Sequence, residues 1–319
     1  MHVVVAGGAG FIGSHLCRRL LADGHEVACL DNLSTGRRVN IAELEANPAF
    51  RFVEHDVTEP MPFEADAVFH LASPASPPGY LRRPVETLRV NSEGTRHLLE
   101  QAHRNGARFL LASTSEVYGD PDIHPQHEGY WGNVNSVGVR ACYDEGKRFA
   151  EAITTTYLRT YDLDARIVRI FNTYGPRSDP DDGRLAPNFI TQALRGAPLT
   201  LYGGGEQTRS LCYVSDLVDG LVRAMFADAA RGEVINLGNP EEHTVREYAE
   251  RIRVLCGSAS PIVHVAAELG DDPRRRRPDI AKARRLLDWQ PRTALDDGLR
   301  ATIAYFSDEL RREAGVLTA

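Results

Sequence analysis

The stretch VVVAGGAGFIGSHL, residues 3–16, decides the fold. The β-branched run at 2–6 predicts a short buried strand, and the residues after the glycines follow helical spacing. Gly7, Gly10 and Gly13 are spaced G-x-x-G-x-x-G, in the strand–turn–helix context of a dinucleotide fingerprint. These glycines would permit the turn, the approach of a pyrophosphate to the helix start, and close helix–strand packing. A purely structural glycine turn is the alternative.

An acidic residue follows at the distance that this fingerprint predicts. Asp31 ends the next expected strand, 27–32, where a carboxylate can bind both hydroxyls of a ribose and would repel a 2′-phosphate. This position favours NAD over NADP as the cofactor. Arg37 and Arg38 lie nearby in the sequence, so an NADP site stays open at this point.

Strand and helix patterns alternate along the first half of the chain. Further strands are expected at 50–57, 65–73, 107–114 and 165–172, and helices at 85–106 and 141–161. Later helical patterns lie near 186–195, 215–227, 245–256, 279–288 and 295–311, with short strands near 199–202 and 233–237.

This order predicts an α/β fold, a Rossmann doubly wound parallel sheet with a smaller C-terminal α/β substrate-binding domain. We expect the NAD-binding domain, with its catalytic helix, in residues 1–175. The second domain should lie mainly in 176–319, with some strand and helix returning to the Rossmann core.

Composition excludes several classes of protein. The chain has 319 residues and a formal net charge of −7, so no global basic field favours nucleic acid or an anionic membrane. Its five cysteines are scattered without CxxC or HExxH spacing, so neither a disulfide framework nor a metal site is expected. No apolar run is long enough to span a membrane. The cytoplasm is the expected compartment.

Tyr143 and Lys147 stand four residues apart in the helix expected over 141–161, so they share one face. A lysine ammonium beside a phenol favours the phenolate and should lower the pKa of the tyrosine. The pair would then serve as a general base near neutral pH. An exposed Tyr/Lys pair is the alternative, but the glycine triad earlier in the chain makes the catalytic interpretation more specific.

A second polar group stands where an apolar strand should end. The stretch STSEVYGD, residues 113–120, sets Ser113, Thr114, Ser115 and Glu116 in a row. A carboxylate among hydroxyls at a strand end indicates a site, and a local salt bridge is the alternative for Glu116.

Several longer segments together carry a family resemblance. GGAGFIG, HLAS, STSEVYG, YDEGK, RIFNTYGPR and YVSDL occur in the order found in the extended short-chain dehydrogenase/reductases that act on nucleotide sugars. HLASPASPPGY, GGEQTRSLCYVSDLVDGL and DDPRRRRPDIAKARRLLDWQP resemble the UDP-glucuronate decarboxylase subfamily more narrowly. The resemblance covers nearly all of the chain.

The resemblance assigns roles to the polar strand end. It implies that Thr114 and Ser115 align the substrate with Tyr143. Sugar dehydratases typically carry an aspartic acid where Ser115 stands, so dehydration is disfavoured. Glu116 would then manage a proton at C5 of the sugar. Arg276 matches an arginine that enters the active site, whereas Arg274, Arg275 and Arg277 are expected to be surface charge.

The same resemblance implies two binding sites. Cofactor binding is expected from Gly7, Gly10, Phe11, Ile12, Gly13, Asp31, Asn32, Ser34, Thr35, Gly36, Asp56, Val57, Leu71, Ala72, Ser73, Ser113, Tyr143, Lys147, Thr173 and Arg177. Substrate binding is expected from Tyr80, Arg89, Glu116, Asn172, Asn188, Tyr202, Gln207, Arg209, Tyr213 and Arg276.

The reaction implied is the NAD-dependent decarboxylation of UDP-glucuronate to UDP-xylose. Tyr143 takes the proton of the 4-hydroxyl while NAD+ takes hydride from C4. The β-keto acid then loses carbon dioxide, and NADH returns the hydride. A UDP-glucuronate or UDP-hexose 4-epimerase and a non-catalytic NAD-binding regulator are the alternatives. The resemblance also implies a homodimer, packed through the helices near 85–105 and 143–161, and the sequence leaves UDP and dTDP undistinguished.

Overall fold

A computed structural model describes residues 1–265 and 275–315. Its strands are β1 (His2–Ala6), β2 (Glu26–Asp31), β3 (Phe50–Glu54), β4 (Ala67–His70), β5 (Arg108–Thr114), β6 (Ala165–Ile170), β7 (Thr173–Tyr174), β8 (Leu199–Tyr202), β9 (Thr208–Arg209), β10 (Cys212–Tyr213), β11 (Val234–Leu237), β12 (His243–Thr244), β13 (Ile262–Val265) and β14 (Arg275–Arg276). Its α-helices are α1 (Phe11–Ala22), α2 (Pro77–Arg82), α3 (Pro84–Arg89), α4 (Thr95–Asn105), α5 (Ala141–Tyr161), α6 (Leu185–Leu194), α7 (Val214–Phe226), α8 (Val245–Leu255), α9 (Ala281–Leu287) and α10 (Leu295–Glu313).

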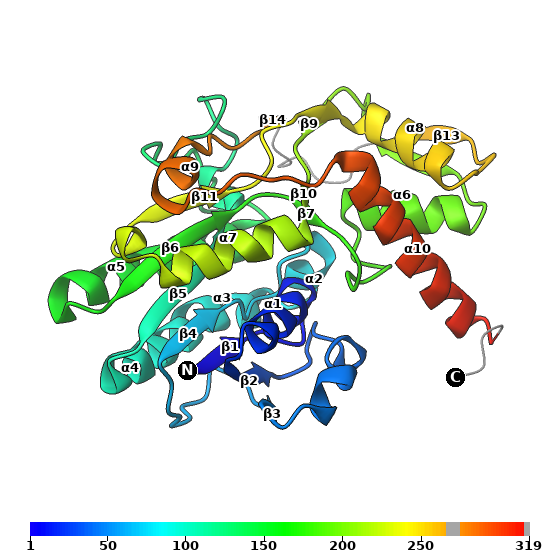
Figure 1. The fold of residues 1–319 in the computed structure, drawn as a ribbon. Coiled ribbons are helices and arrows are strands. Elements are labelled where there is room, and N and C mark those ends of the chain that lie inside the picture. The colour runs from blue at the N-terminus through cyan, green and yellow to red at the C-terminus, as the bar shows by residue number, and fades with distance from the viewer. Residues whose placement is uncertain (266–274, 316–319) are drawn as a thin grey trace.

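A seven-stranded parallel sheet forms the centre of the molecule, in the order β11-β6-β5-β4-β1-β2-β3 (Figure 1). Its strands alternate their apolar side chains between two helical layers, because successive side chains of a strand point to opposite faces. Val3 and Val5 join the core beneath α1 and α7, whereas Val4 and Ala6 join the core beneath α4 and α5. The predicted doubly wound Rossmann fold is confirmed.

The strand order reverses at the centre of this sheet. From β1 the chain passes to β2 and β3 on one side, and then to β4, β5 and β6 on the other. Ligands of such sheets bind at the carboxyl ends of the strands beside this reversal. The ends of β1, β2, β4 and β5 therefore define where the functional site should lie.

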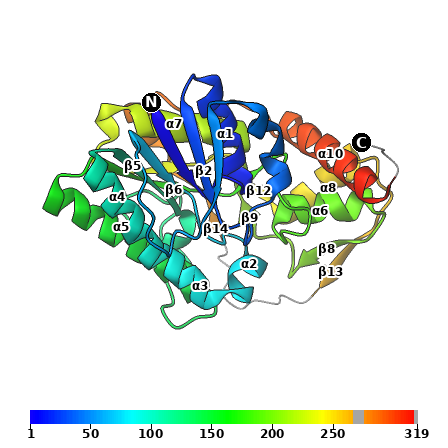
Figure 2. The same cartoon turned by 90° about the horizontal axis from the view of Figure 1, so that it is seen from below.

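The smaller part of the chain packs at one side of the sheet. Helices α6, α8 and α10 surround β8 and β13 with their own apolar core (Figure 2). The chain nevertheless returns to the Rossmann sheet, because β11 pairs with β6 and α7 packs against α1. None of the helices within residues 1–265 and 275–315 combines the length and the apolar character needed to cross a bilayer.

One expected helix is not continuous. The pattern over 85–106 predicts a single helix, but α3 and α4 are joined by a π-helical turn at Val90–Gly94. Asn91 lies in this turn and its amide nitrogen donates to Ser73 at 3.0 Å, beside the end of β4. Helical side-chain spacing cannot reveal one inserted residue per turn, which explains why the sequence missed it.

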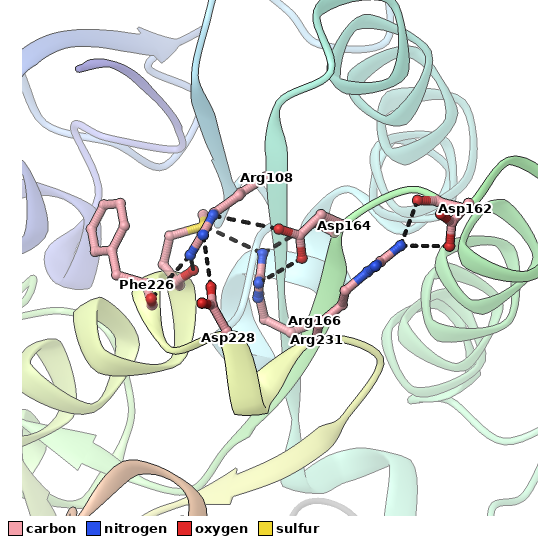
Figure 3. A network of polar contacts seen from close by, with 8 residues as sticks. Arg108, Asp162, Asp164, Arg166, Phe226, Asp228 and Arg231 are labelled. Atoms are coloured by element: carbon pink, nitrogen blue, oxygen red, sulfur yellow. Dashed lines mark hydrogen bonds and ion pairs between the residues drawn. The ribbon is translucent and has the colours of Figure 1, made fainter.

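A network of arginines and acids lies at the opposite ends of the strands from the site (Figure 3). Arg166 is fully buried, and its guanidinium donates to the carboxylate of Asp164 at 2.7 Å. Arg108 donates to the carbonyl of Phe226 at 3.0 Å and to Asp228 at 2.8 Å. These contacts fix the amino ends of β5 and β6 to the end of α7.

Candidate active site

The glycine turn after β1 is packed so closely that larger residues would not fit. A Cβ added to Gly13 would lie 2.1 Å from the carbonyl oxygen of Gly7, and one added to Gly7 would lie 2.6 Å from the backbone nitrogen of Ala72. A Cβ on Gly10 would meet only the Gly7 oxygen, at 3.2 Å. The backbone at Gly10 is therefore open to an approaching group, as binding of a pyrophosphate requires.

Asp31 ends β2 beside this turn, and its carboxylate accepts from the backbone N–H groups of Ala9 and Leu33, each at 2.9 Å. Burial raises the pKa of Asp31, and these hydrogen bonds oppose that rise. A Cβ added to Gly36 would lie 2.6 Å from the carboxylate, so only glycine lets the following loop come this close. This arrangement suits a carboxylate that accepts from ribose hydroxyls.

The two nearby arginines are engaged elsewhere. Arg37 pairs with Glu309 of α10, and Arg38 pairs with Glu45 at 3.0 Å while lying over the ring of Phe52. Both guanidiniums are therefore engaged with protein groups. The two arginines do not support an NADP site, and NAD remains the expected cofactor.

Most other cofactor residues expected from the sequence lie at the same edge of the sheet. Those that follow β1 to β4 are Phe11, Ile12, Asn32, Ser34, Thr35, Asp56, Val57, Leu71, Ala72 and Ser73. Three others have side chains engaged within the protein. Ser113 donates to Glu151 at 2.6 Å, Thr173 to the carbonyl of Phe171 at 2.9 Å, and Arg177 to Glu43 at 3.0 Å.

Tyr143 and Lys147 are both buried on the inner face of α5. The ammonium of Lys147 lies 6.0 Å from the centre of the Tyr143 ring and donates to the carbonyl of Ala112 at 2.9 Å. Burial lowers the pKa of Lys147 to about 7. Burial also raises the pKa of Tyr143, against a hydrogen bond with Thr114 that lowers it. The expectation that Lys147 by itself lowers the tyrosine pKa is thus wrong, because burial penalises the phenolate and the ammonium bonds elsewhere.

The polar strand end lies next to Tyr143. The side chain of Thr114 accepts from the backbone N–H of Glu116 at 3.2 Å, and a 3-10 turn, Ser115–Tyr118, follows. Arg276 of β14 enters from the far end of the chain, and only 2% of it is exposed. Its guanidinium donates to the Ser115 hydroxyl at 3.1 Å and to the Glu116 carboxylate at 3.2 Å.

Glu116 is held between two guanidiniums, those of Arg276 and Arg140. Burial favours its protonated form, but the charges of Arg276, Arg140 and Arg209 outweigh burial and hold the pKa of Glu116 below its usual value. The carboxylate is therefore ionised at neutral pH. Of the two interpretations drawn from the sequence, the geometry favours the ion pair over a proton donor.

Sequence reasoning missed Arg140. This residue precedes the first turn of α5, is buried, and lies 3.9 Å from Asp144 as well as against Glu116. A helix dipole disfavours a cation at its amino end, so an arginine there requires acidic partners. An arginine just before a predicted helix, together with the unexplained carboxylate of Glu116, was the signal in the sequence that could have identified this ion pair.

Tyr80 lies where a substrate contact was expected. Its ring stacks on that of Tyr143, with centres 5.1 Å apart and planes within 5°. Its buried hydroxyl has no hydrogen-bond partner among the described residues. Arg89, expected beside it, is not part of the cluster: its side chain is about half exposed and pairs with Glu93 at 2.9 Å and Glu59 at 3.7 Å.

Two of the remaining substrate candidates lie in different places, Arg209 beside the cluster and Asn188 at a cavity. Arg209 pairs through its backbone with Arg276 and acts electrostatically on Glu116. Asn188 lines a cavity of about 250 Å³ together with Asp181, Gln192 and Arg195.

The other four candidates are Asn172, Tyr202, Gln207 and Tyr213. Tyr213 packs edge-on against Tyr174, and the carbonyl of Asn172 accepts from the backbone N–H of Cys212 at 2.9 Å. The side chain of Gln207 donates to the backbone carbonyl of Tyr202. The Tyr202 residue is exposed. Among the neighbours of Arg276, Arg275 is exposed, Arg277 is half-buried, and Arg274 lies outside the described residues.

A glycine turn and a Tyr/Lys helix on a Rossmann sheet are typical of the NAD-dependent short-chain dehydrogenase class. The match of residues 3–238 to the NAD dependent epimerase/dehydratase family shows that the chain belongs to that family. The chain is 53% identical over 312 residues to UDP-glucuronic acid decarboxylase 1 of Danio rerio, covering 98% of this chain and 74% of that protein. It is 49% identical to UDP-glucuronic acid decarboxylase 1 of Arabidopsis thaliana, covering 98% and 71%.

Solved structures agree with the fold. A UDP-glucuronic acid 4-epimerase from Bacillus cereus, in complex with UDP-glucuronic acid and NAD, superposes with a TM-score of 0.88 at 29% identity, covering 97% of this chain and all of that one. A UDP-glucose 4-epimerase from Thermotoga maritima gives 0.87 at 30% identity. The family expected from the sequence and its NAD cofactor are confirmed.

Proposed function

We propose that this protein decarboxylates UDP-glucuronate to UDP-xylose and keeps NAD throughout the cycle. The observation that carries this proposal is the cluster of Glu116, Arg140 and Arg276 beside Tyr143, with Ser115 at the position next to Glu116. The cluster provides guanidiniums for an anionic sugar, and a serine there cannot act as the acid that a dehydration needs. The named relatives support the same reaction.

The first part of the reaction depends on Tyr143. Its phenolate accepts the proton of the 4-hydroxyl, and the hydroxyl of Thr114 hydrogen-bonds to the tyrosine oxygen. Bound NAD+ supplies the hydride acceptor for C4 and a positive charge at the site. Because burial alone raises the pKa of Tyr143, the phenolate needs such added positive charge.

The second part depends on the arginines. Oxidation at C4 produces a β-keto acid, whose ketone delocalises the electrons left when carbon dioxide departs. Guanidiniums held in fixed positions stabilise the enolate charge that then develops. An ionised Glu116 fixes Arg140 and Arg276 against each other, so its main work here is to place positive charge. C5 then takes a proton from water, C4 regains hydride, and Tyr143 returns the proton to the 4-oxygen.

We also propose that the nucleotide half of the substrate binds between the cluster and α6. Arg209 can make bidentate bonds to a diphosphate. Asn188 and the cavity of about 250 Å³ beside it lie farther along the same smaller part of the molecule.

A homodimer in the cytoplasm completes the proposal. Exposed apolar side chains lie on and before the two helices expected to pair, with Val85 and Leu88 on α3, Phe149 on α5, and Trp131 and Val137 ahead of α5. Trp131 is 88% and Val137 92% exposed in one chain. Light scattering should give twice the mass of one chain. For Phe149→Lys it should give the mass of a single chain.

All five cysteines are free thiols, which suits a reducing compartment.

The deciding experiment incubates UDP-glucuronate with the enzyme and NAD+ and weighs the product by mass spectrometry. A product lighter by carbon dioxide supports the proposal, whereas an isomer of unchanged mass identifies a 4-epimerase, the activity of the similar Bacillus cereus protein. Tyr143→Phe is the inactive control, with turnover reduced by roughly two to four orders of magnitude. Absence of any reaction would leave only an NAD-binding role.

A further inference from the structure

Arg276 reaches the site from a segment that is hardly held by regular structure. Strand β14 has two residues, and it pairs with β9 so that Arg276 lies opposite Arg209. Two residues of pairing cannot by themselves fix a long side chain in a buried position. The Arg276 guanidinium itself donates to Ser115, to Glu116 and to the carbonyl of Gly119, whereas the backbone that carries it depends on contacts made by the residues beside it.

Gln126 makes those contacts from the other side. This residue is fully buried in the loop between the strand end and α5, and nothing in its sequence context marked it. Its backbone N–H donates to the carbonyl of Arg277 at 2.9 Å, and its side-chain oxygen accepts from the backbone N–H of Arg277 at 2.9 Å. Its carbonyl also accepts from the N–H of Asp279 at 2.8 Å.

Gln126 is itself fixed in two ways. Its side-chain nitrogen donates to the carbonyl of Ile123 at 2.8 Å, and its carbonyl accepts from the side chain of Asn236 at 3.1 Å. Asn236, fully buried in β11, accepts from the hydroxyl of Tyr118 at 2.8 Å. The backbone carbonyl of Gln126 thus contacts the central sheet, and its side-chain oxygen holds the segment that carries Arg276.

We infer that Gln126 is a positioning residue for Arg276. Both polar groups of the Arg277 backbone are bound to Gln126, and successive side chains of an extended segment point in opposite directions. Fixing the backbone of Arg277 on one side therefore directs Arg276 to the other, towards Ser115 and Glu116. The inference rests on the proposed function, in which the Arg276 guanidinium stabilises charge on the sugar.

The test is a cycle of Gln126→Met, Arg276→Met and the double variant in the intact enzyme. Methionine keeps the length of glutamine and removes its side-chain hydrogen bonds to Arg277, Ile123 and His124. Gln126→Met should lower turnover of UDP-glucuronate about 10- to 100-fold, because a displacement of about 1 Å costs that much at a catalytic group. NAD affinity should not change. The double variant should be no slower than Arg276→Met alone, since no guanidinium is left to position.

Stability is measured on the same preparations, with Thr302→Val as the matched control. Thr302 is equally buried in α10 and donates only to the carbonyl of Gly298, so its loss should lower the melting temperature and not turnover. Gln126→Asn, which withdraws the amide by one methylene, serves if the methionine variant does not fold. Effects on turnover that multiply in the double variant would overturn the inference, as would a Gln126 variant that is destabilised but fully active.

The two proposals fail in distinguishable ways. The wild-type product identifies the reaction, and an isomer of unchanged mass would refute decarboxylation. In that case the Gln126/Arg276 double-mutant cycle could still be measured with the epimerisation rate. Wild-type turnover by Arg276→Met would overturn the positioning role of Gln126 and leave carbon dioxide release untouched.

Discussion

At the scale of single residues, the site is governed by competition between burial and charge. The same burial that raises the pKa of Tyr143 lowers that of Lys147, because each group loses the water that stabilises its charged form. Glu116, among three guanidiniums, has its charged form favoured in spite of burial. The effect of a substitution therefore depends on which charge it leaves without compensation.

Glu116→Gln should lower both turnover and stability. The amide keeps the shape of the side chain but removes the carboxylate between the buried guanidiniums of Arg140 and Arg276, although Arg140 keeps its contact with Asp144. We expect turnover to fall about a hundredfold, the size typical for loss of one preorganised electrostatic contact, with NAD binding retained. Kinetics and thermal unfolding of one preparation check this result. A variant that is less stable but as fast per folded molecule would reduce Glu116 to an anchor without influence on the reaction.

Lys147→Met should stabilise the free enzyme near neutral pH. With a pKa of about 7 when folded and 10.5 when unfolded, Lys147 binds more protons in the unfolded chain between these values, so stability rises with pH across that window. The stabilisation by methionine should accordingly be largest at or below pH 7 and vanish towards pH 10.5. Thermal unfolding from pH 6 to pH 10 measures it.

Lys282→Met provides the comparison for that series. Lys282 pairs with Glu233 at 2.9 Å and is partly exposed, so its replacement should produce no gain at any pH. Equal responses of the two variants would show that burial of Lys147 does not govern the effect.

At the scale of elements, the network in Figure 3 fixes β5, β6 and α7 together, and it contains both buried and exposed ion pairs. A buried charge costs much more when its partner is removed than an exposed one does. Since the network lies at the amino ends of the strands, changes there should affect stability and not catalysis.

Asp164→Ala should therefore lower the free energy of unfolding by about 3 kcal/mol, because the buried Arg166 guanidinium loses its carboxylate. Asp162→Ala is the control, because its pair with Arg231 is largely exposed and should be worth less than about 1 kcal/mol. Urea unfolding measures both variants. Similar losses in the two would show that Arg166 does not depend on Asp164.

At the scale of the whole molecule, the last helix reaches back to the cofactor loop. Glu309 of α10 pairs with Arg37, which stands 272 residues earlier and next to Gly36 and Asp31. The pairing with Glu309 raises the pKa of Arg37 in spite of burial. The C-terminal part thus neutralises a cation that follows directly on Gly36 in the loop after Asp31.

Glu309→Gln should consequently increase the affinity for NADP relative to NAD, by about threefold to fivefold, as expected for release of about 1 kcal/mol of ion pairing. Calorimetric titration with each cofactor measures the ratio. Glu45→Gln is the matched control, because it frees Arg38, which lies over Phe52 and away from α10. An unchanged ratio in Glu309→Gln would mean that Asp31 alone sets the preference.

The sequence by itself determined the sheet and the NAD cofactor, because the patterns that indicate both are local. The strands, the glycine spacing and Asp31 act within one βαβ unit, and the Tyr143/Lys147 pair within one helix, so their periodicity and spacing are visible in the chain. The interruption of the helix over 85–106 was not visible, because a π-helical turn changes the spacing by a single residue.

Only the tertiary structure decided which charges meet. Arg140, Gln126 and Arg276 converge on one place from positions up to 150 residues apart, through contacts that no local pattern records. The pKa directions of Tyr143, Lys147 and Glu116 likewise follow from burial and from distant partners. The sequence names each ionisable group, but its pKa depends on burial and on neighbouring charges, which exist only in the folded protein.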